Sequence, residues 1–183
     1  MNYEILVNKD NMLDNTYIPD DLVECNSRYK NGIFINKKVL RMFNLMKDNA
    51  YIYGYDIEIM SGYRDYKYQE QIFNKLLNEK GYDYTIRSIA KPGCSEHQTG
   101  LAFDLNSVND DFINTDEGKW INDNAYKYGF ILRYPKGKEK YTGYKYESWH
   151  LRYVGVELAK KLYNNGDWIA LEEYYDLKSE YNS

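Results

Sequence analysis

The sequence of 183 residues lacks the features that mark several large classes of protein. It contains only two cysteines, Cys25 and Cys94, which could form one disulfide bridge in a secreted protein or remain reduced. No segment approaches the roughly 20 apolar residues that a membrane-spanning helix needs, so no membrane span is expected. The net charge of −4 lacks the basic excess of a nucleic-acid-binding protein, and we expect no nucleic-acid partner.

Residues 1–6 lack the basic and apolar regions of a secretory signal peptide. A chain that starts at a native Met1 is therefore expected to stay in the cytoplasm. A chain cut at the start of a mature domain would look the same, and it would then be an excised extracellular domain. The sequence does not indicate the oligomeric state.

The length fits one domain, expected over residues 1–183, because no repeat, linker or low-complexity tract divides the chain. Apolar periodicity predicts helices over residues 37–49, 65–80, 116–128, 155–164 and 168–178, and strands over residues 3–8, 55–60, 101–105, 130–134 and 150–154. Residues 9–34 and 82–96 are predicted to be turn-rich or connecting segments. Helices at both ends and mostly antiparallel strands between them indicate an α+β domain with a central sheet flanked by helices.

Histidine is also scarce, and both copies, His97 and His150, lie in dense polar segments that read SEHQTGLAFD and ESWH. These segments also contain Asp104 and Glu147. Two imidazoles and a carboxylate suit Zn²⁺, with a fourth position open for water, and a second carboxylate could take a proton from that water. We therefore predict that His97, Asp104 and His150 bind zinc and that Glu147 is the general base. From spacing alone, the alternative is that these histidines are packed or surface residues.

The ligands are expected to converge from a loop and two strands. Apolar residues alternate along 101–105, so Asp104 should face away from the apolar side of its strand. Glu147 lies three residues before His150, and in an unbroken strand their side chains would face opposite sides. We therefore expect the backbone to bend between Glu147 and His150.

The two motifs, Ser-x-His-x-x-Gly-x-Ala-x-Asp and Glu-x-Trp-His, resemble those of the zinc D,D-peptidases of the VanX/VanY type, the M15 peptidase family. The likeness includes residues 61–64 (SGYR), 92–97 (PGCSEH) and 128–135 (YGFILRYP), and it extends over roughly residues 5–175. The compact form is most similar to the VanXY branch, which acts in the cytoplasm on D-Ala-D-Ala and on pentapeptide precursors ending in it.

The resemblance implies the LAS-type fold of zinc D,D-peptidases and hydrolysis of D-Ala-D-Ala termini by a zinc-dependent D,D-carboxypeptidase or D,D-dipeptidase. Peptidoglycan precursor peptides are then the expected partners. The resemblance implies that Arg64 holds the substrate and the developing oxyanion, and that Ser95 and Gln69 line the substrate pocket. It assigns zinc to the residues matching His97, Asp104 and His150, and catalysis to the one matching Glu147.

Several alternatives share these motifs. An L,D-carboxypeptidase would remove D-Ala from tetrapeptides, a cell-wall endopeptidase would cut elsewhere, and a non-catalytic domain would bind zinc without turnover.

Three further residues have two possible roles each. Arg133 is either a second substrate anchor or a surface residue, and Cys94 is either a buried residue or a metal ligand. Asp65 is either a helix cap or a partner of Arg64. The sequence leaves open the preferred substrate length, discrimination against D-Ser or D-lactate termini, and any role in antibiotic resistance.

Overall fold

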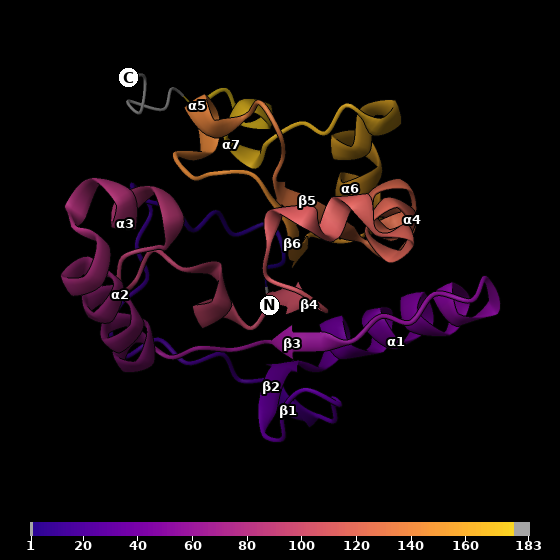
Figure 1. Ribbon diagram of the computed structural model, residues 1–183, viewed down its shortest axis with the longest axis horizontal. Coiled ribbons are helices and arrows are strands. Elements are labelled where there is room, and N and C mark those ends of the chain that lie inside the picture. The colour runs from indigo at the N-terminus through magenta and orange to yellow at the C-terminus, as the bar shows by residue number, and fades with distance from the viewer. Residues whose placement is uncertain (1, 178–183) are drawn as a thin grey trace.

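A computed structural model describes residues 2–177, in which six strands form a hairpin and a four-stranded sheet (Figure 1). The hairpin pairs β1 (Leu22–Cys25) with β2 (Ile33–Asn36). The sheet has the order β3 (Ile59–Ser61), β4 (Ala102–Leu105), β6 (Glu147–Tyr153) and β5 (Phe130–Tyr134), and all neighbouring strands are antiparallel. The predicted α+β class with a mostly antiparallel central sheet is confirmed.

Helices surround the sheet on several sides (Figure 1). The α-helices are α1 (Lys37–Ile52), α2 (Tyr66–Lys80), α3 (Tyr82–Ser88), α4 (Asp116–Asn124), α5 (Glu139–Thr142), α6 (Val156–Tyr163) and α7 (Leu171–Tyr174). Short 3-10 helices are η1 (Glu96–Thr99), η2 (Asp110–Asn114), η3 (Ala125–Tyr128) and η4 (Asn164–Gly166). In Figure 1, α2 and α3 form a lobe at the left, separate from α4 and α6 at the right.

The core lies where α1 packs against the sheet. Buried residues follow helical spacing on α1, at Val39, Phe43, Met46 and Ala50. The ring of Phe43 meets that of Phe103 on β4 edge to face, with centroids 5.3 Å apart. Because side chains alternate along a strand, this packing turns the other face of β4 toward the candidate site.

Both ends of the helix predicted over residues 65–80 agree with their capping signals. Asp65 caps α2, because its carboxylate accepts a hydrogen bond from the Tyr68 backbone N–H. Gly81 ends the helix with a φ of 78°, a left-handed value that favours glycine. The N-cap interpretation of Asp65 is thus confirmed.

Four predicted segments were wrong. Residues 3–8 form no strand, because the carbonyls of Tyr3 and Ile5 accept hydrogen bonds from Arg152 rather than from another strand. Residues 9–34 contain β1 and the first two residues of β2, and residues 82–96 contain α3. Within 168–178 the helix is only α7, and residue 178 lies outside the described residues.

No helix within residues 2–177 is long and apolar enough to cross a membrane.

Candidate functional site

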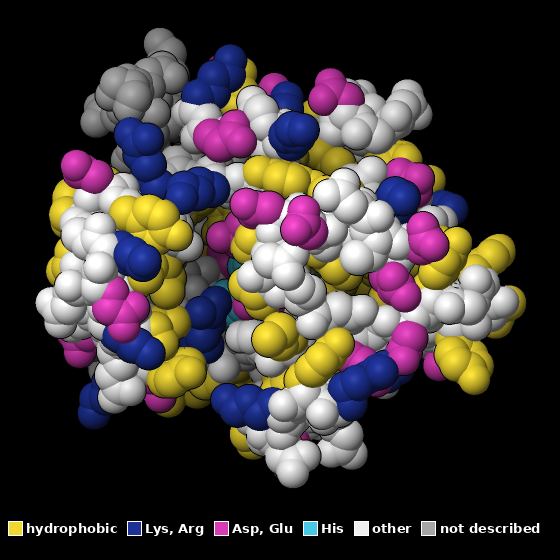
Figure 2. Space-filling model, viewed as in Figure 1, with side chains coloured by type: hydrophobic (Ala, Val, Ile, Leu, Met, Phe, Trp, Pro, Cys, Tyr) yellow, Lys and Arg dark blue, Asp and Glu magenta, His cyan; other side chains and the backbone are white. Residues whose placement is uncertain are grey.

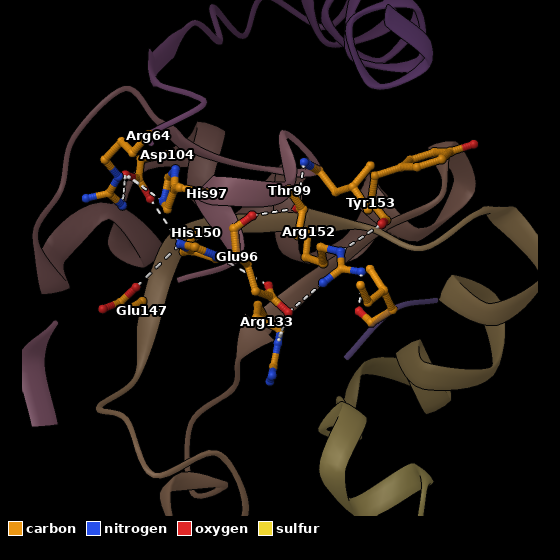
Figure 3. A network of polar contacts seen from close by, with 12 residues as sticks. Arg64, Glu96, His97, Thr99, Asp104, Arg133, Glu147, His150, Arg152 and Tyr153 are labelled. Carbon is orange, nitrogen blue, oxygen red and sulfur yellow. Dashed lines mark hydrogen bonds and ion pairs between the residues drawn. The ribbon is translucent and has the colours of Figure 1, made fainter. Parts of the chain in front are cut away.

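Three elements bring His97, Asp104 and His150 together. His97 lies on η1, Asp104 on β4 and His150 on β6, and the β4–β6 register places Asp104 directly opposite His150. One ligand atom from each residue lies within 4.8 Å of the others. Asp104 Oδ2 is 3.4 Å from His97 Nε2, and its Oδ1 is 3.2 Å from His150 Nδ1 (Figure 3). The three side chains therefore form a group of the size that a single metal ion spans.

The hydrogen bonds of His97 fit a metal ligand. Its Nδ1 lies 2.6 Å from the Gly62 carbonyl, which can only accept, so Nδ1 carries the hydrogen. Its Nε2 then presents a lone pair toward Asp104, and it is buried without a hydrogen-bond partner. Burial and the nearby Arg64 lower the pKa of His97 to about 4, so the ring is neutral, as a ligand must be.

His150 lies among carboxylates that favour a positive charge. Burial disfavours its protonated form, but Asp104 and Glu96 outweigh burial and raise the pKa of His150 to about 9. Either a proton or a metal cation can supply that charge. Metal binding at this site is therefore expected to compete with protons.

Glu147 reaches the same site because β6 departs from regular pairing. Leu132 pairs with Leu151, but two residues further along β5 Tyr134 pairs with Glu147, where unbroken pairing would have opposed it to Trp149. The expected bend between Glu147 and His150 is confirmed. Glu147 Oε2 lies 3.7 Å from His150 Nδ1, and burial raises the pKa of Glu147 to about 7, a value suited to accepting and returning a proton.

A pocket of about 180 Å³ opens onto this group, and Figure 2 shows histidine at the bottom of the hollow beside the α2–α3 lobe. Arg64, Gln69 and Ser95, to which the resemblance gave substrate-binding roles, all line it. The Arg64 guanidinium lies 3.9 Å from Asp104 Oδ2, and its Nε is buried without a hydrogen-bond partner. Gln69 donates to the Ala90 carbonyl at 2.7 Å, which leaves its Oε1 buried and unpartnered.

The sequence did not reveal part of the pocket wall. The missed lining residues are Ser88, Ile89, Ala90, Val108, Tyr134 and Tyr144. Ser88 ends the unpredicted helix α3, and Ile89 and Ala90 follow it, within a stretch that the sequence marked only as a connecting segment. Tyr134 lay in the quoted segment 128–135 without an assigned role; its ring is 4.9 Å from that of His150.

Burial and contacts decide between the alternative roles that the sequence left open for Arg133 and Cys94. Arg133 is fully buried and pairs with Glu96 and Glu172, so it is neither a surface residue nor a pocket residue. Cys94 is buried and free, and it does not belong to the metal-binding group. The interpretation of Cys94 as a small buried residue is confirmed.

Comparison with known proteins agrees with this geometry. The family model VanY, described as D-alanyl-D-alanine carboxypeptidase, matches residues 32–156. The protein YodJ of Bacillus subtilis (strain 168) is 44% identical over 182 residues, covering 93% of this chain and 66% of YodJ. The chain spans about half to two thirds of the length of the curated relatives it matches.

Two solved structures are similar over almost the whole chain. The LD-carboxypeptidase LdcB has a TM-score of 0.86 at 43% identity, covering 94% of this chain and 86% of LdcB. A variant of the D,D-pentapeptidase VanY from a VanB-type resistance cassette, in complex with Zn(II), has a TM-score of 0.81 at 35% identity, covering 96% of this chain and 99% of that one.

Proposed function

The chain belongs to the VanY family of D-alanyl-D-alanine carboxypeptidases, and on that premise we propose that it is a zinc peptidase that hydrolyses D-Ala-D-Ala termini of peptidoglycan precursors. The observation that carries the proposal is the convergence of His97, Asp104 and His150 beside Glu147 at the bottom of one pocket. The Zn(II) complex of the similar VanY structure supports the identity of the metal.

The proposed zinc ligands are His97 Nε2, a carboxylate oxygen of Asp104 and His150 Nδ1. Two imidazoles and one carboxylate suit Zn²⁺ and leave a coordination position open. When bound, Zn²⁺ supplies a Lewis acid that polarises the substrate carbonyl and makes water more acidic.

Glu147 is the proposed general base. Its pKa near 7 lets it accept a proton from the attacking water and then deliver that proton to the departing amine of D-Ala. It lies beside His150 but outside the ligand group, so its carboxylate remains available for proton transfer.

Arg64 is the proposed electrophilic partner of the substrate. A guanidinium in a partly buried pocket can stabilise the negative charge that develops on the carbonyl oxygen, and its planar fork also suits a carboxylate. Ser95 and the unpartnered Oε1 of Gln69 supply polar contacts that orient the peptide.

The likeness to LdcB supports a second candidate, an L,D-carboxypeptidase that removes D-Ala from tetrapeptides. The two activities differ in the residue that precedes the scissile bond, and the pocket walls that would select it come from α3 and from Tyr134, Tyr144 and Trp149.

One experiment separates the candidates: D-Ala release by the zinc-loaded protein from D-Ala-D-Ala, a pentapeptide precursor and a tetrapeptide. We expect release from the dipeptide and the pentapeptide. Release from the tetrapeptide alone would make the protein an L,D-carboxypeptidase. Zinc binding with no release from any substrate would favour a non-catalytic domain and overturn the proposal.

A further inference from the structure

A second polar cluster lies directly behind His150, away from the pocket. It consists of Glu96, Arg133, Arg152 and Glu172, and we call it the ion cluster (Figure 3 labels the first three). Glu96 Oε1 accepts from Arg133 Nε at 2.7 Å and from Arg152 at 2.6 Å. The Glu96 side chain is fully buried, so the two guanidinium groups replace the water it has lost.

The arginines that hold Glu96 are themselves anchored. Arg133 binds both carboxylate oxygens of Glu172, at 2.9 and 2.7 Å. Arg152 donates to the backbone carbonyls of Tyr3 and Ile5, at 3.0 and 2.7 Å. Glu96 therefore cannot turn away from its position without breaking bonds to two fixed cations.

The second oxygen of the Glu96 carboxylate is bound by neither arginine. Glu96 Oε2 is buried without a hydrogen-bond partner, and so is His150 Nε2, which lies 3.8 Å away. The opposite ring nitrogen, Nδ1, is the atom that faces Asp104 and Glu147. When Nδ1 presents its lone pair to a metal, the hydrogen of a neutral imidazole must lie on Nε2, where Glu96 is the acceptor that faces it.

We propose that Glu96 is a positioning residue for His150: its Oε2 accepts the Nε2 hydrogen and holds Nδ1 toward the metal position. The proposal rests on the proposed zinc site but not on the substrate. His97 has a corresponding partner in the Gly62 carbonyl, so each imidazole of the site has one acceptor at its far nitrogen. Partners of this kind fix the orientation and tautomer of metal-binding histidines.

The test compares Glu96→Gln with Glu172→Gln in the full chain. In Glu96→Gln, the arginines require the amide oxygen on their side, so the amide NH₂ faces the His150 N–H, and two donors oppose each other. Glu172→Gln is the matched control. It removes one negative charge from the partners of Arg133, as Glu96→Gln does, but the side chain at position 172 does not face His150. Both variants should unfold more easily without metal, as measured by thermal denaturation.

The decisive readout is the dissociation constant for zinc, measured by competition with a chelator. We expect it to rise roughly 10- to 100-fold in Glu96→Gln and to stay close to the wild-type value in Glu172→Gln. An unchanged value in Glu96→Gln, or an equal rise in both variants, would overturn the positioning role.

A measurement on the wild type keeps the proposal testable if Glu96→Gln does not fold. The chain has two histidines, so nuclear magnetic resonance of the zinc-loaded protein labelled with ¹⁵N-histidine can resolve each ring proton. We expect a slowly exchanging proton on His150 Nε2, and its absence would overturn the proposal. Zinc binding without turnover would overturn the proposed function alone, whereas a wild type that binds no zinc would overturn both.

Discussion

Two polar clusters lie back to back at β6, and they differ in how completely their atoms are paired. In the group that faces the pocket, buried atoms of His97 and Arg64 have no hydrogen-bond partner. In the ion cluster behind it, Arg133 makes three charge-assisted bonds and Arg152 has both carboxylate and carbonyl acceptors, and the unpartnered carboxylate oxygen is the Glu96 Oε2 that faces His150. A buried polar atom left unpaired costs about 1–3 kcal/mol, so the unpaired atoms of the first group suit a ligand, whereas the paired arginines of the second contribute to stability.

The charge balance differs in the same way. The ion cluster pairs two guanidinium groups with two carboxylates at short distance. The pocket group has the carboxylates of Asp104 and Glu147, while its one arginine, Arg64, stays 3.9 Å from Asp104. Similar residue types therefore form a candidate cation site in one place and a network of buried ion pairs in the other.

The largest expected effect lies at the proton-transfer residue of the pocket group. Glu147→Ala should keep zinc and lose turnover by about 10²- to 10⁴-fold, because it removes the proposed general base but none of the proposed ligands. Metal content and kcat for D-Ala release measure the two properties separately. A variant that loses its zinc would show that Glu147 is a ligand.

Arg64→Lys tests whether the arginine of the pocket group acts on the substrate. Lysine keeps the charge but loses the planar fork, so we expect kcat to fall by roughly 10²-fold, about 3 kcal/mol, with the fold intact. Steady-state kinetics and circular dichroism report the outcome. An unchanged kcat would remove Arg64 from the oxyanion role.

Arg133→Met tests the ion cluster as a structural element. Methionine fills part of the space but leaves Glu172 and Glu96 each without one buried cation, so the free energy of unfolding should fall by about 3 kcal/mol. Chemical denaturation of the metal-free protein measures it. A loss below about 1 kcal/mol would mean that the paired cluster contributes no more than an exposed ion pair.

The smallest expected effect on the free energy of unfolding is that of Lys119→Gln, which is the exposed-pair control for Arg133→Met. Lys119 pairs with Asp116 at 3.6 Å, but both side chains are mostly exposed, so solvent screens the pair. Denaturation should show no measurable change in the unfolding free energy. A loss as large as that of Arg133→Met would mean that burial does not distinguish the two pairs.

Local signals predicted much of the fold and the candidate site. Periodicity and capping located α1 and α2, and alternation on β4 placed Asp104 opposite the apolar core. The bend before His150 followed from the spacing of two residues that had to share one site.

The ion cluster could not be predicted because its partners are distant in sequence. Glu96 is 37 residues from Arg133 and 56 from Arg152, and no periodicity links them. The hairpin and α3 were missed because their short segments carry weak patterns, and tertiary packing decides such cases. Arg133 illustrates the limit: its charge suggested a substrate or solvent contact, and only the fold supplied its partners.

The anchors of Arg152 and Arg133 also determine how far the chain can be trimmed. The segment that matches the family model, residues 32–156, contains every candidate site residue. It omits the carbonyls of Tyr3 and Ile5 at one end and Glu172 at the other. A fragment cut to those limits would keep the candidate site residues but remove part of the acceptors of two buried arginines, so we expect a stable fragment to be longer than the matched segment and to include both outer segments.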